Sequence, residues 1–200
     1  NETTLVLGSA GTVIASFNDS GSNLVGSDPG GNQFTGWARS TNGGTSFTDR
    51  GRLTASSMGD AGDPVLVRST KTGTVLLATL GFTDDAALPI FRSVDDGVTL
   101  LAPVNGSPGF VTGTDSQDKE WLAVDNNAGT AYGNFYMFWR NFSSSGANDG
   151  MTFSRSTDDG LTWTTVGRLA AGGQGAWPVV GADHAVYAFW YDSSAAPRKI

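Results

Sequence analysis

Three eight-residue segments that share one pattern restrict the fold of this chain more than any other feature. They span 40–47, 93–100 and 156–163 and read Ser-x-Asp/Asn-x-Gly-x-Thr/Ser, followed by an aromatic residue or Leu. Their starts are 53 and 63 residues apart. An Asp or Asn side chain accepts backbone N–H bonds across a turn, and Gly adopts the positive φ that a hairpin turn needs. The pattern therefore predicts one supersecondary unit that recurs along the chain. The positions that carry it are Ser40, Asn42, Gly44, Phe47, Ser93, Asp95, Gly97, Thr99, Ser156, Asp158, Gly160, Thr162 and Trp163.

Short apolar segments recur in phase with the octapeptides. The pairs that precede them, and a fourth pair near the end, lie at 3–8 and 12–18, 63–68 and 74–82, 120–125 and 134–141, and 177–182 and 185–191. The later members of these pairs are apolar nearly throughout, which is typical of strands covered on both faces. A third strand leads into each octapeptide and a fourth follows it. Four strands in each unit of roughly 55 residues predict an all-β fold, a β-propeller of four-stranded antiparallel blades.

We expect a single, partial propeller domain over residues 1–200. The expected blades are 1–56, 57–113, 114–170 and an incomplete fourth at 171–200. An open half-ring exposes strand edges and blade faces to water. The remaining blades are therefore expected from the same, longer chain, or alternatively from another copy or another protein.

Composition supports an all-β fold and excludes several classes of function. The chain has two Glu and three Lys, which are common on helix surfaces, against 28 Gly. Twelve basic and 19 acidic residues give a formal charge of −7, which argues against binding to nucleic acid or to anionic membranes. The absence of Cys excludes disulfides, thiolate zinc sites and a cysteine nucleophile. The sequence contains no run of about 18 apolar residues, so no membrane-spanning helix is predicted.

The octapeptides resemble Asp-boxes, the Ser-x-Asp-x-Gly-x-Thr-Trp repeats of sialidases and related BNR-repeat propellers. The segment 156–163 matches every fixed position, whereas Asn42, Ser46 and Leu100 depart from it. The segment 118–125, Asp-Lys-Glu-Trp-Leu-Ala-Val-Asp, also resembles the start of a blade in secreted bacterial sialidase-like proteins. The resemblance implies six blades, with the boxes as structural turns on the face opposite the substrate.

The same resemblance implies a secreted, extracellular or cell-surface protein. Four Asn-x-Ser/Thr sequons fit this location, although about two are expected by chance at this composition. They begin at Asn1, Asn18, Asn105 and Asn141.

Side chains suited to sugar recognition lie in segments that we expect at the upper face, opposite the octapeptides. Carboxylates bind sugar hydroxyls, and aromatic rings stack on sugar faces. Each residue also has a structural explanation, because acidic side chains cap turns and face solvent in any all-β protein. The candidates are Asp19, Asp63, Asp118, Glu120, Arg140, Trp177 and Tyr191.

A sialidase needs further groups. The resemblance implies three arginines that bind a carboxylate, a Tyr nucleophile helped by a Glu, and an Asp acid/base. The first arginine of the family opens the first blade in an Arg-Ile-Pro motif, but the strand 3–8 contains no Arg. Arg39, Arg92 and Arg155 each directly precede an octapeptide, which is a scaffold position. Catalytic residues therefore stay unassigned.

Metal and cofactor chemistry has little support. The segments 60–63 and 125–127 offer oxygen ligands of the kind that Ca²⁺ prefers, but neither has EF-hand spacing. His184 is the single histidine, which excludes a histidine-based triad or zinc site within this sequence. We assign no metal and no cofactor, with Ca²⁺ as the alternative.

Three functional hypotheses remain. The first is a secreted propeller that binds glycans or other extracellular ligands on the face opposite the octapeptides. The second is a glycoside hydrolase of sialidase type whose catalytic residues lie mostly in other blades. The third is a structural module of an extracellular assembly.

Overall fold

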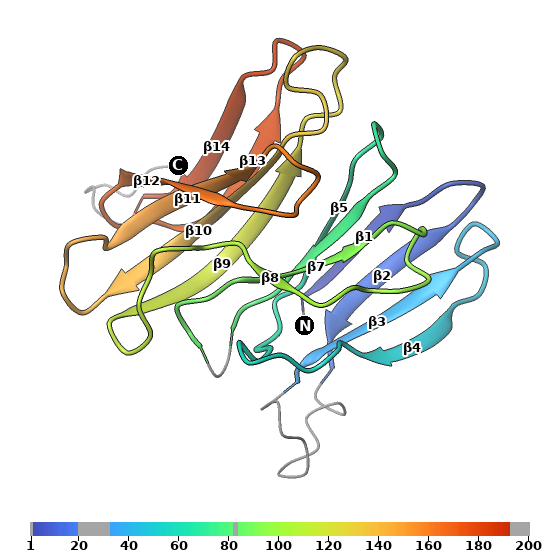
Figure 1. Cartoon of the computed structure of the whole chain (residues 1–200), viewed down its shortest axis with the longest axis horizontal. Coiled ribbons are helices and arrows are strands. Elements are labelled where there is room, and N and C mark those ends of the chain that lie inside the picture. The colour runs from blue at the N-terminus through green and yellow to red at the C-terminus, as the bar shows by residue number, and fades with distance from the viewer. Residues whose placement is uncertain (1, 20–32, 82–83, 193–200) are drawn as a thin grey trace.

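The computed structural model describes residues 2–19, 33–81 and 84–192, and every regular element in these ranges is a β-strand. The strands form three four-stranded sheets and one two-stranded sheet. Figure 1 shows them in succession, from β1–β4 at the right to β13 and β14 at the upper left. No helix in the described ranges is long and apolar enough to cross a membrane.

Each sheet takes its strands in chain order. Blade 1 consists of β1 (Thr3–Leu7), β2 (Val13–Asn18), β3 (Thr35–Ser40) and β4 (Thr48–Arg52). Blade 2 consists of β5 (Val65–Arg68), β6 (Val75–Ala78), β7 (Pro89–Ser93) and β8 (Val104–Asn105). Blade 3 consists of β9 (Asp115–Val124), β10 (Phe135–Ser143), β11 (Gly150–Ser156) and β12 (Thr164–Ala170). The described part of blade 4 is the pair β13 (Gln174–Val180) and β14 (Val186–Tyr191).

Neighbouring strands in every sheet are antiparallel. The first strands of successive blades contact one another, β1 with β5, β5 with β9, and β9 with β13. The first strands therefore lie innermost and the fourth strands outermost. This arrangement confirms the predicted fold class, an all-β partial β-propeller of four-stranded antiparallel blades.

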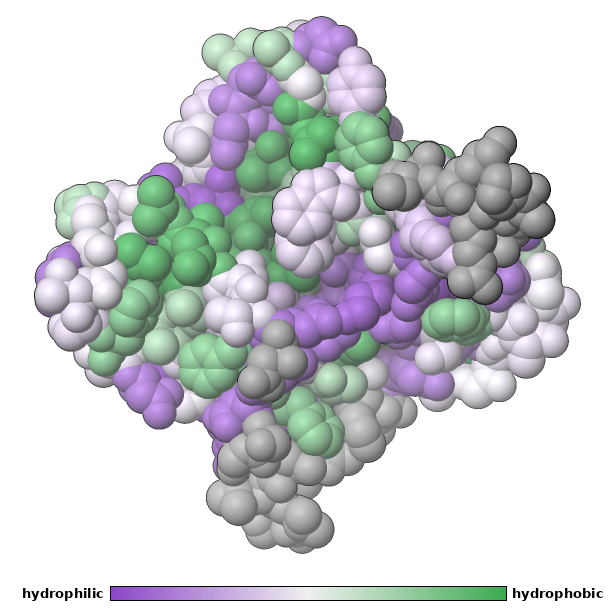
Figure 2. Space-filling model, turned by 180° about the vertical axis from the view of Figure 1, so that it is seen from behind, coloured by the Kyte–Doolittle hydropathy of each residue, from purple (hydrophilic) through white to green (hydrophobic). Residues whose placement is uncertain are grey.

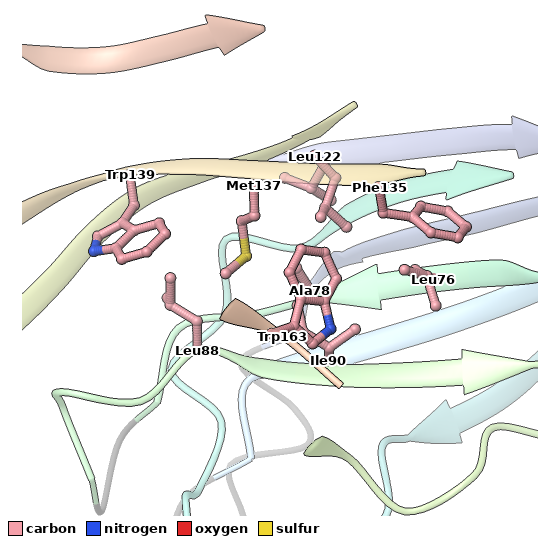
Figure 3. Packing of buried hydrophobic residues seen from close by; sticks show 10 residues of the cluster. Leu76, Ala78, Leu88, Ile90, Leu122, Phe135, Met137, Trp139 and Trp163 are labelled. Carbon is pink, nitrogen blue, oxygen red and sulfur yellow. The ribbon is translucent and has the colours of Figure 1, made fainter. Parts of the chain in front are cut away.

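Where a blade has a neighbour on each side, both of its faces are buried. All four residues of β6 are buried. Leu76 and Ala78 pack in the core shared with blade 3, and Val75 and Leu77 pack in the core shared with blade 1. Figure 3 shows side chains of β9 and β10, such as Met137, facing those of β6 and β7. This two-sided burial explains why the second strands show no polar alternation.

The octapeptides form the turns between third and fourth strands, and one hydrogen-bond pattern holds them. In the third turn the Ser156 hydroxyl donates to Asp158 Oδ1 at 2.7 Å and accepts from the Gly160 N–H at 3.0 Å. The Thr162 N–H donates to Asp158 Oδ1 at 3.0 Å. The second turn repeats these bonds, and the first uses Asn42 in place of Asp. The side chains of the pattern therefore act within their own turn.

The last residue of each octapeptide behaves differently from turn to turn. Trp163 is buried in the core between blades 2 and 3, and Leu100 packs at the edge of the core between blades 1 and 2. Phe47 is 46% exposed and does not anchor its turn between two blades. The reason is that the described residues place no blade on that side of blade 1.

Arginines at the ends of the third strands join successive blades. Arg39 Nε donates to the Asp96 carbonyl in the next octapeptide at 2.8 Å, and Arg92 Nε donates to the Asp159 carbonyl at 2.9 Å. Arg92 Nη2 also lies 3.0 Å from Asp159 Oδ2. Arg155 occupies the same position in blade 3 and is exposed, and its side chain has no hydrogen bond or ion pair to another described residue. Arg39 and Arg92 are therefore scaffold residues.

Replacing Arg92 with Ala should lower the free energy of unfolding by about 1–2 kcal/mol, because it removes charge-assisted bonds between two blades. Replacing Arg155 with Ala makes the same chemical change without a described partner and should stay within about 0.5 kcal/mol. Urea denaturation of both variants measures the difference. Equal effects of the two substitutions would contradict the assigned blade contact.

Candidate functional site

A cavity of about 380 Å³ lies beside the beginnings of the first strands and is called the axial pocket here. Its lining includes the side chains of Glu2, Lys119, Glu120, Trp121 and Trp177. In a blade of four antiparallel strands, the first strand begins at the end opposite the turn between the third and fourth strands. Glu2 therefore lies at the end of blade 1 opposite the octapeptide turns, and Lys119, in the middle of β9, lies beside it.

A bulge in the middle of β9 positions the pocket residues of blade 3. The pairing of β9 with β10 shifts register between Phe138 and Arg140, and Lys119 on the opposite strand has φ 52°. Asp63 (φ 55°) and Gly175 (φ 68°) take the same left-handed conformation near the starts of β5 and β13. A bulge re-aims side chains and locally increases strand twist. Strand β9 begins at Asp115, so the expectation that this strand begins at 120 is wrong by five residues.

Lys119 connects three blades through its ammonium group. Its Nζ lies 2.9 Å from Asp63 Oδ2 and also contacts Glu2 Oε1. Burial by itself lowers the pKa of Lys119, but the hydrogen bonds and charges of Glu2 and Asp63 outweigh burial and raise the pKa above its ordinary value. The ammonium group is therefore charged and held by two carboxylates.

Glu120 is the unusual acid of the pocket. Its side chain is 2% exposed, and neither carboxyl oxygen has a hydrogen-bond partner in another described residue. Burial raises the pKa of Glu120 well above its ordinary value, and the charges of Asp63, Asp118 and Glu2 raise it further. Burial therefore favours the protonated form of this carboxyl group, which can donate a hydrogen bond.

Two tryptophans form the apolar part of the pocket. The ring centroids of Trp121 and Trp177 lie 4.4 Å apart with 31° between the planes. Trp177 is 54% exposed, so its ring is accessible from solvent. Figure 2 shows a hydrophilic band across the centre of one face of the molecule, with apolar surface above it and to its left. The pocket thus combines a charged cluster, a buried acid and aromatic rings.

The structure brings together four of the residues predicted from the sequence. Glu120 and Trp177 line the axial pocket, Asp63 holds Lys119, and Asp118 Oδ2 accepts a bond of 2.6 Å from Gln174 Nε2 beside them.

Arg140, Asp19 and Tyr191 are not among the residues that line the axial pocket. Arg140 lies inside β10, where Nη2 donates to both carboxylate oxygens of Asp149 at 2.8 Å. Asp19 follows β2, and its N–H donates to the Phe34 carbonyl at 2.6 Å. Tyr191 ends β14 opposite Gln174. No arginine is among the described residues that line the pocket.

Glu2, Lys119 and Trp121 were not among the predicted site residues. A usable signal existed, because Trp121 and Trp177 occupy matching places in successive first strands. The partners of Lys119 carry no such signal, since they lie 56 and 117 residues away in the sequence.

The two segments considered for Ca²⁺ use their carboxylates in other contacts. Asp60 accepts bonds from the Thr35 hydroxyl at 2.6 Å and from the Thr35 and Gly62 N–H groups at 2.8 and 2.9 Å. Asp125 Oδ2 lies 2.7 Å from Nδ1 of His184, which joins blade 3 to blade 4. The part of the chain that the structure describes contains no group of three or more acidic or histidine side chains that could hold a metal ion.

Replacing Glu120 with Gln should raise the stability of the protein increasingly as the pH rises above 4.5, the ordinary pKa of the group. The folded protein holds this proton more tightly than the unfolded chain, so its stability is greatest at low pH and falls as the pH approaches the raised pKa. Gln removes that fall, and the difference should grow by up to about 1.4 kcal/mol per pH unit. Urea denaturation between about pH 4 and pH 8 measures it.

The comparison variant is Asp158→Asn, for which the stability relative to the unsubstituted protein should change with pH in the opposite direction. Burial raises the pKa of Asp158, but bonds from Thr162 and Ser156 outweigh burial and lower the pKa below its ordinary value of 3.8. The stability from this carboxylate is present above pH 3.8 and is lost as the pH falls. If the free energies of unfolding of the Glu120→Gln variant and of the unsubstituted protein differ by the same amount at every pH, the raised pKa of Glu120 is contradicted.

No protein-family model matches the chain, and no curated protein matches it. Solved propeller structures do match. The GH93 α-L-arabinofuranosidase of Fusarium graminearum with arabinobiose is 14% identical at a TM-score of 0.66, covering 94% of this chain and 55% of its own. The intramolecular trans-sialidase from Ruminococcus gnavus is 14% identical at 0.61, covering 97% and 66%. The six-bladed fucose-recognising lectin of Aleuria aurantia is 13% identical at 0.56, covering 97% and 60%. This chain is therefore similar in fold to propellers that act on or bind carbohydrates, and it spans about half to two thirds of their length.

Proposed function

We propose that this protein is a secreted propeller of the Asp-box type that binds carbohydrate in the axial pocket. In the proposal, its octapeptide turns are Asp-boxes, and a six-bladed ring completes the pocket from blades of the same, longer chain. The observation that carries the proposal is the presence of an exposed tryptophan, a buried unpaired acid and a charged cluster in one cavity.

The groups in this cavity match the chemistry of a sugar. The exposed ring of Trp177 offers a flat apolar surface on which the C–H face of a sugar ring can stack. The Glu2 side chain is 39% exposed and can accept hydrogen bonds from sugar hydroxyl groups, whereas the Glu120 carboxyl is buried. A few polar groups around an apolar surface are the usual composition of a small-molecule site. The fold similarity to carbohydrate-active propellers and to a lectin supports the same function.

Glycoside hydrolysis is the second candidate, and the pairing of acids favours it. Glycosidases use one protonated acid and one carboxylate. Burial raises the pKa of Glu120 well above its ordinary value, and Glu2 lines the same cavity. An assay for reducing sugar released from the bound glycan distinguishes the two functions. Release by the unsubstituted protein that is abolished in the Glu120→Gln variant would favour hydrolysis over binding alone.

Replacing Trp177 with Ala should lower the affinity for the best-binding glycan by at least about tenfold, because it removes the stacking surface. A glycan array identifies the ligand, and isothermal titration calorimetry measures both affinities. Thermal denaturation of the variant checks that the fold persists after loss of the contact with Trp121.

Phe47→Ala is the matched control, since it removes an aromatic ring of similar exposure at an octapeptide turn. Its affinity should equal that of the unsubstituted protein. Unchanged binding by Trp177→Ala, or an array without any bound glycan, would refute the proposed site.

A further inference from the structure

The charges around the axial pocket are unbalanced, and they point to one class of sugar. Glu2 and Lys119 line the cavity, and Asp63 and Asp118 lie close enough to act on Glu120 by charge. The single ammonium group of this cluster is that of Lys119, which both Glu2 and Asp63 contact. The cluster thus contains three acidic side chains, Glu2, Asp63 and Asp118, and one cation, which Glu2 and Asp63 contact.

We propose that the axial pocket selects uncharged sugars and rejects sialic acids and uronic acids. The inference rests on the carbohydrate-binding function proposed above and names the class of ligand. An acidic sugar needs a cation with free hydrogen-bonding capacity, and arginine supplies it best through two parallel bonds. The described lining of the pocket contains no arginine, and the carboxylates of the protein already hold the one ammonium group.

An acidic sugar would also lie close to like charges. Its carboxylate would enter a cavity bordered by Glu2, with Asp63 and Asp118 nearby. Repulsion between carboxylates is strong in such a partly buried site, where water screens charges less than at an open surface. An uncharged sugar meets no such repulsion, and its hydroxyls can donate hydrogen bonds to the carboxylates.

The geometry also predicts how the selectivity can be reversed. The double variant Glu2→Gln/Asp63→Asn removes both charges that hold Lys119 and keeps the ammonium group in the pocket. Asn is suitable at position 63 because it tolerates the left-handed conformation that Asp63 adopts. Lys119 then becomes available to a ligand carboxylate.

The test uses two pairs of ligands in which one member carries a carboxylate. These are glucose with glucuronic acid, which differ only at C6, and lactose with 3′-sialyllactose, which adds a sialic acid residue; arabinobiose and L-fucose serve as further uncharged probes. Calorimetry at low ionic strength should show the uncharged member of a pair binding at least tenfold more tightly. The double variant should reduce this preference at least tenfold. The control Asp49→Asn/Asp183→Asn makes the same change in net charge at exposed positions outside the pocket and should leave the preference unchanged.

The outcomes separate this inference from the function on which it rests. Tighter binding of 3′-sialyllactose or glucuronic acid by the unsubstituted protein would overturn the selectivity and leave carbohydrate binding intact. An equal change of preference in the double variant and in the control would also overturn it, because the effect would then come from overall charge. No binding of any uncharged or acidic sugar would overturn the proposed function itself. Thermal denaturation of each variant confirms that it is folded.

Discussion

Burial between the faces of successive blades is the interaction on which this structure depends. A blade such as β5–β8 is apolar on both faces, and it is covered by blade 1 on one side and blade 3 on the other. Burying one large apolar side chain contributes roughly 1.5–3 kcal/mol, so the cores between blades dominate the stability of the fold. The octapeptide turns and the Arg39 and Arg92 contacts then fix how each blade meets the next.

The segment 118–125 combines this packing with the candidate site. Asp118 bonds to Gln174, Trp121 stacks on Trp177 and Asp125 contacts His184, so three of its side chains reach blade 4. Lys119 reaches blades 1 and 2 instead. The charged and aromatic groups of this segment therefore have structural partners, and the one acid without a partner, Glu120, lines the pocket. A single strand thus holds the blades together and supplies the buried acid of the pocket.

The described lining of the axial pocket differs from the sialic acid site that the resemblance to sialidases implies. The resemblance implies arginines that bind the carboxylate of a sialic acid, whereas the described lining of the pocket offers one lysine that two acids already hold. Arg140, the one arginine among the predicted site residues, is bound to Asp149 away from this lining. The shared fold with glycosidases and a lectin is therefore compatible with a different ligand, because specificity depends on the residues of the site and not on the fold.

The sequence by itself determined the fold class, the approximate strands and the turns, because these depend on local chemistry. The bonds within an octapeptide join residues two to four positions apart, and the apolar second strands show their burial directly. The tertiary structure alone decided that Lys119 meets Asp63 and Glu2, which lie 56 and 117 residues away. It also decided that Glu120 is buried without a partner, because a bulge in β9 and the packing of three blades aim these side chains. Such contacts depend on how whole blades stack, and no local pattern in the sequence encodes that stacking.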